Sequence, residues 1–592
     1  MPSWLSDVME LKNIKSPADI RSMSMSELYA LADEVRAALL QKLSQHGGHI
    51  GPNLGMVEAT IALHYVFDTP NDQIVFDVSH QSYTHKMLTG RAQAFLEQTH
   101  FDDVTGYTNP EESPYDLFTI GHTSTSVSLA TGLAKARDLK GGDWNVVAVI
   151  GDGSLSGGEA FEGLNNGSVL HSNFIVVVND NEMSIAENHG GLYADLRLLR
   201  NTKGEGQPNF FRSLGYAYRF VAKGNDIAQL INVFREVKNS SNPVVVHIVT
   251  EKGHGYAPAV ADKERFHWGL PFDLATGVST IDDNNPDYGD FTYELLREQL
   301  EKGTDLAVLT AGTPGVASFN PERRKEFGKR FIDVGIAEEQ AAAMASGLAR
   351  NGVRPFWEVH SSFVQRAYDQ ISQDIAINNS PVVIAVFGAS VYAIPDVTHL
   401  GWFDQTLLAN IPNVVFLAPA DKDEYAAMVN WSLSQTDHPV VIRVPVGPLE
   451  SLGLEVDDDY SDINTYRLVR SGHDIAIVAA GNMIASALAA ADILAAKGVN
   501  ATVINPRFLS GIDEEMLSSL SPDHRAVLTV EDAILDGGMG QKIASFYADR
   551  PMLVRNLGLP KEFVDNYDAY KFAETAHLTP QGIAGQALAM FK

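Results

Sequence analysis

The chain has 592 residues, with 44 Lys and Arg against 74 Asp and Glu, so its formal net charge is −30. This acidic excess argues against a general nucleic-acid-binding protein, and the absence of cysteine excludes disulfides, thiolate metal sites and cysteine nucleophiles. With 45% hydrophobic and 20% charged residues, and no apolar stretch long enough to span a bilayer, we expect a cytoplasmic globular protein that does not act at a membrane.

Apolar runs alternate with helical patterns along the chain, which predicts an α/β fold with buried parallel strands. The first helix is expected after Ser24, because Ser24 and Glu27 form a capping box. Its apolar face is formed by Leu28, Leu31, Val35 and Leu39. The first strands are expected at 146–150, 174–178 and 244–249.

Two further α/β series follow. A polar stretch rich in Pro and Gly, 271–289, marks the first boundary, and an acidic linker, 447–463, marks the second. Strands are expected at 306–310, near Phe356, and at 382–387, 475–479, 501–504 and 526–530. Helices are expected after Ala337, through 366–377 and at 484–497. The predicted domains are 1–285, 286–450 and 465–592.

The segment with the clearest chemistry joins two predicted strands. The first delivers Gly151-Asp152-Gly153 to its carboxyl end, and the next delivers Asn179-Asp180-Asn181. Ligands bind at this edge of open parallel sheets, and a helix that begins near Gly157 would present free N–H groups to an anion. Carboxylate and amide oxygens suit Mg²⁺ together with a diphosphate. The alternative is a pair of ordinary turns, since both tripeptides are good loop sequences.

A GDG motif followed about thirty residues later by asparagine resembles the thiamine-diphosphate enzymes, and the resemblance is strongest to the 1-deoxy-D-xylulose-5-phosphate synthase family. It runs through nearly the whole chain and implies a three-domain, transketolase-like architecture with mostly parallel sheets covered by helices. The segments that carry it include GHIGPNLG (48–55), NDNEMSI (179–185), DVGIAEEQ (333–340), HSSFVQRAYDQ (360–370) and EDAILDGGMG (531–540).

The resemblance implies cofactor ligands by position. Magnesium would be held by Asp152, Asn181 and the Met183 carbonyl. Thiamine diphosphate would be contacted by His80, Gly121, His122, Ser124, Gly151, Asp152, Gly153, Ser154, Asn181 and Phe363. Glu338 would hydrogen-bond the cofactor pyrimidine, and burial should raise its pKa. The alternative for Glu338 is an ordinary acid at a helix N-terminus.

The resemblance also implies substrate-binding residues. The catalytic set would be Glu338, His49 and His399. Substrate would be bound by His49, His267, Arg366, Tyr368, Asp396, His399 and Arg507. A lone histidine is more often structural or exposed, but His49, His80, His122, His267 and His399 all lie in polar stretches, which favours a polar pocket. The alternative for Arg507 is a surface arginine.

The departures from the family pattern concern the acceptor side. The family arginine after the strand at 382–387 is replaced by Gly388, and the acidic residue that precedes His399 is shifted by one place to Asp396. The family histidine after Glu-Gln is missing from Glu338-Glu339-Gln340, and the segment after Asn188 is shorter than the family insertion and is a candidate mobile flap.

The resemblance implies decarboxylation of pyruvate and addition of its two remaining carbons to glyceraldehyde 3-phosphate or another sugar phosphate, in a homodimer. The alternatives are a transketolase that moves a two-carbon ketol unit without loss of CO₂, and a non-catalytic paralogue that keeps the fold.

Overall fold

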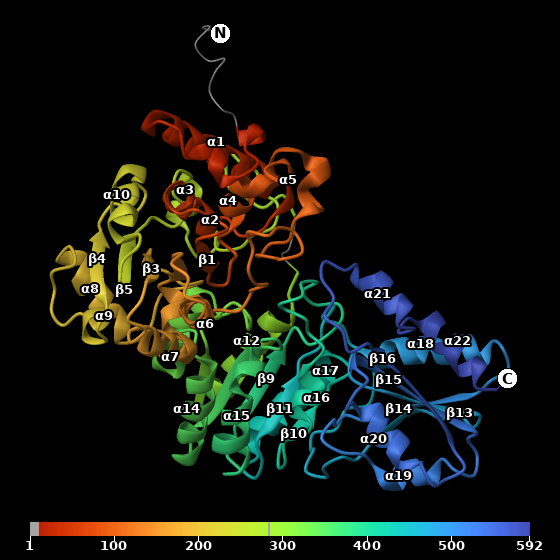
Figure 1. Ribbon diagram of the computed structural model, residues 1–592. Helices are drawn as coiled ribbons and strands as arrows, with labels where there is room; N and C mark the ends of the chain where they lie inside the picture. The colour runs from red at the N-terminus through yellow and green to blue at the C-terminus, as the bar shows by residue number, and fades with distance from the viewer. Residues whose placement is uncertain (1–10, 282–284, 592) are drawn as a thin grey trace. The chain divides into compact units, whose positions relative to one another are not determined.

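The structure is a computed structural model that describes residues 11–281 and 285–591. The chain divides into two compact units (Figure 1). The first unit holds the residues up to 284 together with Gly335–Ala337, and the second holds Asn285–Val334 and Glu338–Lys592. The division lies inside the predicted boundary at 271–289, of which 282–284 fall outside the described residues, as do the first ten residues of the chain.

The first unit is built on a five-stranded parallel sheet in the order β1-β2-β3-β5-β4. Its strands are β1 Gln73–Phe76, β2 Val146–Gly151, β3 Phe174–Asp180, β4 Ala217–Val221 and β5 Pro243–Val249. Helices α1 Met25–His46, α3 Val57–Val66 and α10 Ile227–Val237 pack on one face. Helices α6 Ser126–Leu139, α7 Gly158–Gly167, α8 Leu192–Asn201 and the short α9 Phe210–Ser213 pack on the other. The sheet is therefore buried on both sides, as its Val- and Ile-rich strands predict.

The predicted capping box at the start of α1 is confirmed. Ser24 Oγ accepts from Glu27 N, and Glu27 Oε2 accepts from Ser24 N at 2.6 Å. The four predicted apolar residues of this helix are all buried.

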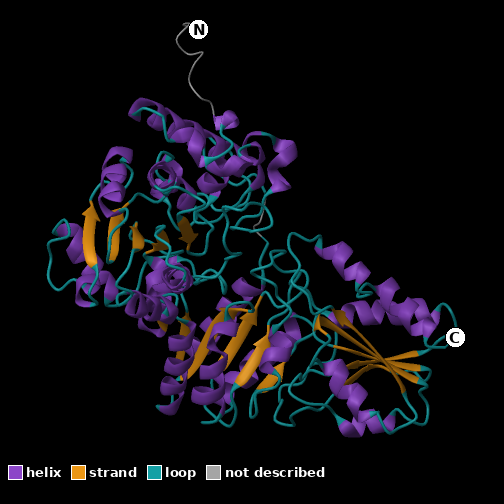
Figure 2. Cartoon of the chain, in the orientation of Figure 1, coloured by secondary structure: helices purple, strands orange, loops and turns teal. Residues whose placement is uncertain are grey.

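The second unit contains two sheets (Figure 2). The six-stranded parallel sheet, in the order β10-β11-β9-β8-β6-β7, consists of β6 Leu306–Thr310, β7 Phe331–Asp333, β8 Arg354–His360, β9 Val383–Phe387, β10 Val415–Leu417 and β11 Val440–Arg443. The five-stranded sheet, in the order β12-β14-β13-β15-β16, consists of β12 Arg467–Arg470, β13 Ile475–Ala479, β14 Ala501–Asn505, β15 Ala526–Ile534 and β16 Leu553–Leu559. Only β12 is antiparallel to its neighbour among these described strands.

Helices cover both sheets of the second unit. The longer ones are α12 Tyr288–Glu301, α14 Glu338–Arg350, α17 Lys422–Ser434, α18 Met483–Ala495, α20 Met539–Phe546 and α22 Pro580–Ala589. One apolar cluster continues from the six-stranded sheet, through residues such as Trp357 and Ile384, to Val527 and Ile543 beside the five-stranded sheet. This shared core explains why three sheets form two compact units.

The fold class predicted from the sequence is confirmed, but one helix is not regular. The predicted helix through 366–377 is a 3₁₀ turn at Val364–Ala367, a short α-helical turn at Tyr368–Gln370 and a π turn at Ile371–Ala376. The break falls at Ala367, whose φ of −100° and ψ of 17° lie outside the α-helical region.

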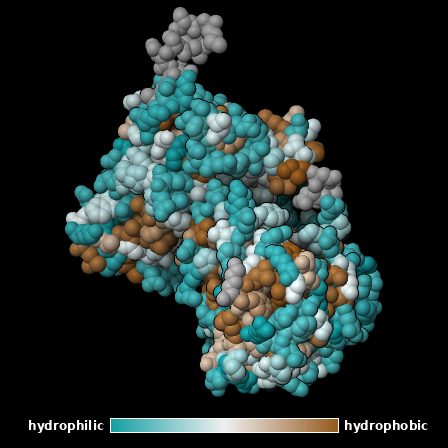
Figure 3. All heavy atoms as spheres, turned by 90° about the vertical axis from the view of Figure 1, so that its right-hand side faces the viewer, coloured by the Kyte–Doolittle hydropathy of each residue, from teal (hydrophilic) through white to brown (hydrophobic). Residues whose placement is uncertain are grey.

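Hydrophilic residues cover most of the face in Figure 3, with hydrophobic patches between them, as is usual for a globular protein. Within the residues that the structure describes, none of the helices is both long enough and apolar enough to cross a bilayer.

Candidate active site

The two motifs predicted to meet at one sheet edge do so in the first unit. Strands β2 and β3 are neighbours, with Gly151 in register with Asn179, and Asp152 N donates to Asn179 O at 3.0 Å. Asp152 is 1% exposed, and its Oδ2 accepts from Met183 N at 3.1 Å and from Asn188 Nδ2 at 2.8 Å. The GDG loop and the segment after β3 are therefore in direct contact.

The oxygen atoms at this edge fit a magnesium ion. Asn181 Oδ1 and Asn188 Oδ1 are buried without a hydrogen-bond partner among the described residues. Burial raises the pKa of Asp152, and the neighbouring Asp180 raises it further. No group of three or more His, Asp or Glu side chains is placed to hold a metal in the described part of the chain. A cation here would therefore rely on one carboxylate with amide and carbonyl oxygens, a donor set that Mg²⁺ accepts.

Asp180, between the predicted ligands, has a structural role. Its carboxylate pairs with Arg200 at 2.6 Å and with His247 at 2.8 Å. Burial alone would raise the pKa of Asp180, but the hydrogen bonds from His247 and Arg200 outweigh it and lower that pKa. Because these partners already bind its carboxylate, Asp180 is not expected to be a metal ligand.

Two glycines allow the loops beside Asp152 to pass closely. A Cβ at Gly153 would lie 2.8 Å from Ser184 Cβ, and one at Gly157 would lie 2.2 Å from Ser124 Oγ. Ser124, with φ of +77°, donates through Oγ to Ser154 O at 2.8 Å and through N to Asp77 Oδ1 at 2.8 Å. The predicted Gly121 and His122 lie in the loop just before Ser124. This loop is therefore held against the GDG loop.

Three of the predicted histidines form one cluster in the first unit. The ring centroids of His49 and His80 are 4.9 Å apart, those of His80 and His267 are 5.2 Å apart, and those of His49 and His267 are 5.8 Å apart. The pKa of His267 is lowered well below its usual value, first by burial and then by the nearby Lys252, His80 and His49. Neutral imidazoles of this kind can both donate and accept hydrogen bonds.

Lys252 is a site residue that the sequence reasoning missed. It follows the carboxyl end of β5, is 1% exposed, and its Nζ lies 2.6 Å from Ser184 O and 3.1 Å from His267 Nδ1. Burial lowers the pKa of Lys252 to about 7, although the charge of Asp152 acts to raise it. The signal that could have found it is its place shortly after a buried strand, close to the position that identified Asp152.

The second unit carries the other group of predicted residues. Glu338 is the first residue of α14 and is 4% exposed. Burial raises the pKa of Glu338 to about 6, and Arg366, whose Nη1 lies 3.5 Å from Glu338 Oε2, limits the rise. The direction of this shift agrees with the sequence-based expectation.

Phe363, His399 and Asp396 lie together beside β8. The Phe363 and His399 ring centroids are 5.5 Å apart, and His399 Nδ1 lies 3.3 Å from Asp396 Oδ1. His360, which the sequence reasoning did not single out, is 5.3 Å from Phe363 and 6.3 Å from His399 between ring centroids. Burial would raise the pKa of Asp396, but hydrogen bonds from His399 and Thr398 lower it.

The surroundings of Tyr368 and Arg507, two predicted substrate-binding residues, give little support for ligand binding. Tyr368 is 39% exposed at the start of its short helix. Arg507 forms an ion pair with Asp457 and donates through Nη2 to Thr465 O at 2.8 Å and to Thr465 Oγ1 at 2.7 Å. These contacts favour a structural role for Arg507 in fastening the linker, while its phosphate-binding role stays a prediction.

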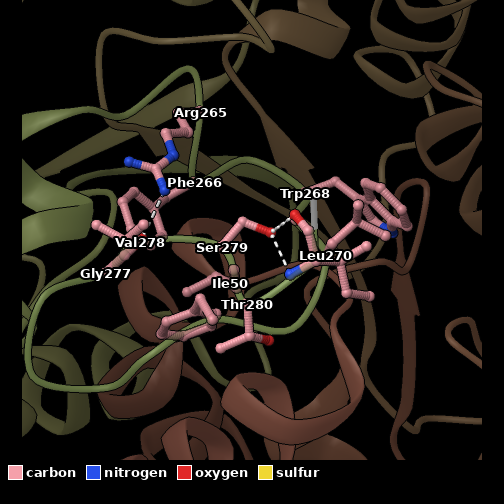
Figure 4. Close-up of a pocket in the computed structure, with 12 residues that line it drawn as sticks. Ile50, Arg265, Phe266, Trp268, Leu270, Gly277, Val278, Ser279 and Thr280 are labelled. Atoms are coloured by element: carbon pink, nitrogen blue, oxygen red, sulfur yellow. Dashed lines mark hydrogen bonds between the residues drawn. The ribbon is translucent and has the colours of Figure 1, made fainter. Parts of the chain in front are cut away.

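A cavity of about 650 Å³ in the first unit is distinct from these clusters (Figure 4). Phe266, Trp268 and Leu270 form part of its wall, and Arg265 Nη2 donates to Gly277 O at 2.6 Å beside it. His267, between Phe266 and Trp268, contacts Lys252 and the histidine cluster instead. One short segment thus serves both the cavity wall and the polar cluster.

Comparison with known proteins identifies the family. The family model described as 1-deoxy-D-xylulose-5-phosphate synthase matches residues 11–207 and 197–250. Those of the transketolase pyrimidine-binding domain and C-terminal domain match 284–450 and 464–583.

Curated relatives extend the match to nearly the whole chain. The 1-deoxy-D-xylulose-5-phosphate synthase of Symbiobacterium thermophilum is 38% identical, over 98% of this chain and 95% of its own length. Synthase 1 of Geobacter sulfurreducens is 39% identical, over 94% and 93%. A solved transketolase variant from Pichia stipitis is 17% identical, covers 96% of this chain and 98% of its own, and gives a TM-score of 0.41. The identity to the curated relatives over almost their full length means that the chain belongs to the 1-deoxy-D-xylulose-5-phosphate synthase family.

Proposed function

We propose that the protein is a thiamine-diphosphate-dependent transferase that forms 1-deoxy-D-xylulose 5-phosphate from pyruvate and glyceraldehyde 3-phosphate, with loss of CO₂. The observation that carries this proposal is the identity of 38% to 39% to curated synthases over nearly the full chain. The match to a transketolase pyrimidine-binding domain supports the cofactor assignment.

In this proposal, residues of the first unit hold the diphosphate end of the cofactor. Asp152, Asn181 and the Met183 carbonyl would bind Mg²⁺, and the unpartnered Asn181 Oδ1 supports this assignment. His80, Ser124, Ser154 and the glycines of the GDG loop would lie around the diphosphate. In its protonated form, which the charge of Asp152 favours, Lys252 would offset phosphate charge.

Residues of the second unit would serve the reacting end. When bound, thiamine diphosphate supplies a carbon nucleophile and then accepts the electron pair released by decarboxylation. Glu338, with a pKa near 6, can hold a proton at its carboxyl group close to neutral pH and so hydrogen-bond a ring nitrogen. Phe363 would pack against the ring, and His399 would hydrogen-bond substrate oxygens. His49 and His267, which belong to the first unit, are predicted to bind substrate oxygens as well.

Several finer assignments belong to the same proposal. The three domains would be 1–285, 286–450 and 465–592. The family models that match 284–450 and 464–583 support the starts of the second and third domains, whereas the first model ends at 250. A homodimer and a cytoplasmic location stay predictions from the resemblance and the composition.

The decisive experiment is incubation of the purified protein with thiamine diphosphate, Mg²⁺, pyruvate and glyceraldehyde 3-phosphate. We expect equal amounts of CO₂ and 1-deoxy-D-xylulose 5-phosphate. In a parallel incubation, a ketose phosphate replaces pyruvate as the two-carbon donor. Transfer of its ketol unit to an aldose phosphate, with no CO₂ formed from pyruvate in the first incubation, would support the transketolase alternative, which the two transketolase family models make the natural second candidate. Cofactor binding without any turnover would support a non-catalytic paralogue.

A further inference from the structure

Helix α8 lies in the segment after Asn188, which is predicted as a candidate mobile flap from the sequence. The structure gives this segment a regular helix, Leu192–Asn201, with Leu196 and Leu199 fully buried. Both leucines belong to the apolar cluster that covers one face of the five-stranded parallel sheet. The helix is therefore packed onto the sheet of the first unit in the same way as the helices around it.

The first turn of α8 contacts the GDG loop through a tyrosine hydroxyl. Tyr193 is 8% exposed, and its hydroxyl donates to Asp152 O at 3.1 Å, while Gly153 O lies 3.3 Å from the same hydroxyl. The carboxylate of Asp152, which is assigned to magnesium, accepts from Met183 N and from Asn188 Nδ2. The backbone and the side chain of Asp152 are therefore held by contacts from different segments.

The last turn of α8 contacts the segment after β3 through an arginine. Arg200 Nη1 donates to Asp180 Oδ2 at 2.6 Å and to Asp180 Oδ1 at 2.8 Å. Arg200 Nη2 donates to Glu182 Oε1 at 2.7 Å. Asp180 and Glu182 are the two neighbours of Asn181, whose Oδ1 is assigned to magnesium. One guanidinium thus fixes the chain on both sides of a predicted ligand.

The spacing of Tyr193 and Arg200 allows one helix to reach both loops. The two residues are seven positions apart, which is close to two full turns, so they lie on the same face of α8 about 10 Å apart along its axis. The two loops that they contact carry the predicted magnesium ligands Asp152 and Asn181. All of these residues belong to the first unit, so the contacts are independent of the second unit.

We propose that Tyr193 and Arg200 are positioning residues, through which α8 holds the GDG loop and the segment after β3 in the geometry that binds Mg²⁺ and the diphosphate before either ligand is present. This inference rests on the proposed function. A site that needs no ordering when its ligand binds loses less conformational entropy, so its affinity is higher. A flap that closes over the cofactor predicts the opposite, because α8 would then be held only in the loaded protein.

The first test is Tyr193→Phe, which removes only the hydroxyl. Tyr216→Phe is the matched control, because Tyr216 is 3% exposed and its hydroxyl donates to Leu164 O of α7 at 2.7 Å. We expect the Kd for thiamine diphosphate with Mg²⁺, measured by calorimetry, to rise about fivefold in Tyr193→Phe, as for loss of one hydrogen bond. With saturating cofactor, kcat should stay within about twofold of the wild type. An unchanged Kd would overturn the inference.

The control separates positioning from a general loss of stability. Both variants lose a buried hydrogen bond in the same unit, so both should lower the Tm of the protein without cofactor. Only Tyr193→Phe should weaken cofactor binding. An equal rise in Kd in Tyr193→Phe and Tyr216→Phe would overturn the positioning role. A wild-type protein that binds no thiamine diphosphate in the presence of Mg²⁺ would instead overturn the proposed function.

The second test is limited trypsin digestion with and without Mg²⁺ and thiamine diphosphate, with the fragments identified by mass spectrometry. Arg197 in α8 and Lys203 just after it are exposed, so cleavage after them measures how often the helix opens. We expect the wild type to be cut there slowly, and equally slowly with and without cofactor. Rapid cleavage that only the cofactor suppresses would show a closing flap and overturn the inference.

The same digestion tests Arg200. Without cofactor, Arg200→Met should be cut after Arg197 and Lys203 at least about tenfold faster than the wild type, since α8 loses its contact with the segment after β3. Arg219→Met is the control, because Arg219 forms a largely exposed pair with Glu236 in the same unit, and it should be digested like the wild type. Unchanged cleavage in Arg200→Met would contradict the role assigned to this arginine.

Discussion

Glu338 is a carboxyl group whose surroundings favour its neutral form. Its pKa rises from 4.5 to about 6 in the folded protein, which corresponds to about 2 kcal/mol at about 1.4 kcal/mol per unit. Since the folded state binds this proton more tightly, the contribution is present below pH 4.5 and is lost as pH rises through 6. Near neutral pH the Glu338 carboxyl is mostly ionised, and its burial in that form destabilises the folded state.

Replacing Glu338 with glutamine should separate activity from stability. Glu338→Gln cannot exchange a proton at this position, so we expect kcat to fall at least 100-fold. Its Tm should equal or exceed that of the wild type, and the difference should grow between pH 4.5 and 6.5. Circular dichroism melts across that range check the prediction, and retained activity would refute the role assigned to Glu338.

Asp152→Asn tests the proposed magnesium site. The variant keeps the size of the side chain but removes the one carboxylate of the ligand set, so we expect the Kd for thiamine diphosphate in the presence of Mg²⁺ to rise at least tenfold. Isothermal titration calorimetry with and without Mg²⁺ measures this. Asp549→Asn is the control, since Asp549 is 90% exposed in its side chain. Equal affinities of Asp152→Asn and the wild type would exclude Asp152 as a ligand.

At the residue scale, the sequence predicted motifs better than contacts. The contact of Asp152 with the segment after β3, and the meeting of His49, His80 and His267, were within reach because these residues lie in motifs that follow strands or fill polar loops. Lys252 was missed although its place shortly after β5 was a usable signal. His360 was missed because its packing beside Gly388, on the neighbouring strand, cannot be seen in either segment alone.

At the scale of elements, buried strands were the easiest to predict. Runs such as 306–310 and 475–479 match β6 and β13 residue for residue, since a strand covered on both faces is continuously apolar. Short or half-exposed strands such as β7 and β12 lack that signal. The predicted helix at 366–377 instead consists of a 3₁₀ turn, a short α-helical turn and a π turn, because its apolar spacing predicts a helical path but not the type of turn.

Arg443 connects elements of the two sheets in the second unit. It extends from β11 and pairs with Asp404 of α16 (Asp404–Leu408) and with Asp532 of β15, all three being buried. Removing one partner leaves buried charge uncompensated, which costs about 3–5 kcal/mol. We therefore expect Arg443→Met to lower the free energy of unfolding by about this amount in urea denaturation. Arg297→Met, in an exposed pair with Glu294, should leave it nearly unchanged.

For the molecule as a whole, two sets of buried groups oppose each other in their effect on pH stability. Burial raises the pKa of Glu424 and of Glu531 to about 7. The free energy of unfolding that their protonation contributes at low pH is therefore lost as pH rises toward 7. Burial lowers the pKa of His64 and His267, so these groups favour folding more as pH rises through 6.5. The two effects partly cancel, and we expect a broad stability maximum.

The effect of the two buried carboxyl groups on stability can be measured by comparing the wild type with a variant that lacks them. The double variant Glu424→Gln/Glu531→Gln should gain Tm relative to the wild type as pH rises from 5 to 7.5, because glutamine does not ionise. Melts at several pH values in 0.3 M salt check this, since salt screens the surface repulsion of a chain with charge −30 but acts little on buried groups. A difference in Tm that is constant with pH would contradict the assigned shifts.

Many of the candidate groups stand just beyond a strand's last residue: Asp152 after β2, Asn181 after β3, Lys252 shortly after β5 and Gly388 after β9. The side chains that hold the sheets together precede them and point into separate apolar clusters. The predicted ligand-binding groups and the residues that stabilise the fold thus lie in different parts of each strand–loop unit. Libraries of variants confined to these loop positions should therefore retain a high fraction of folded members.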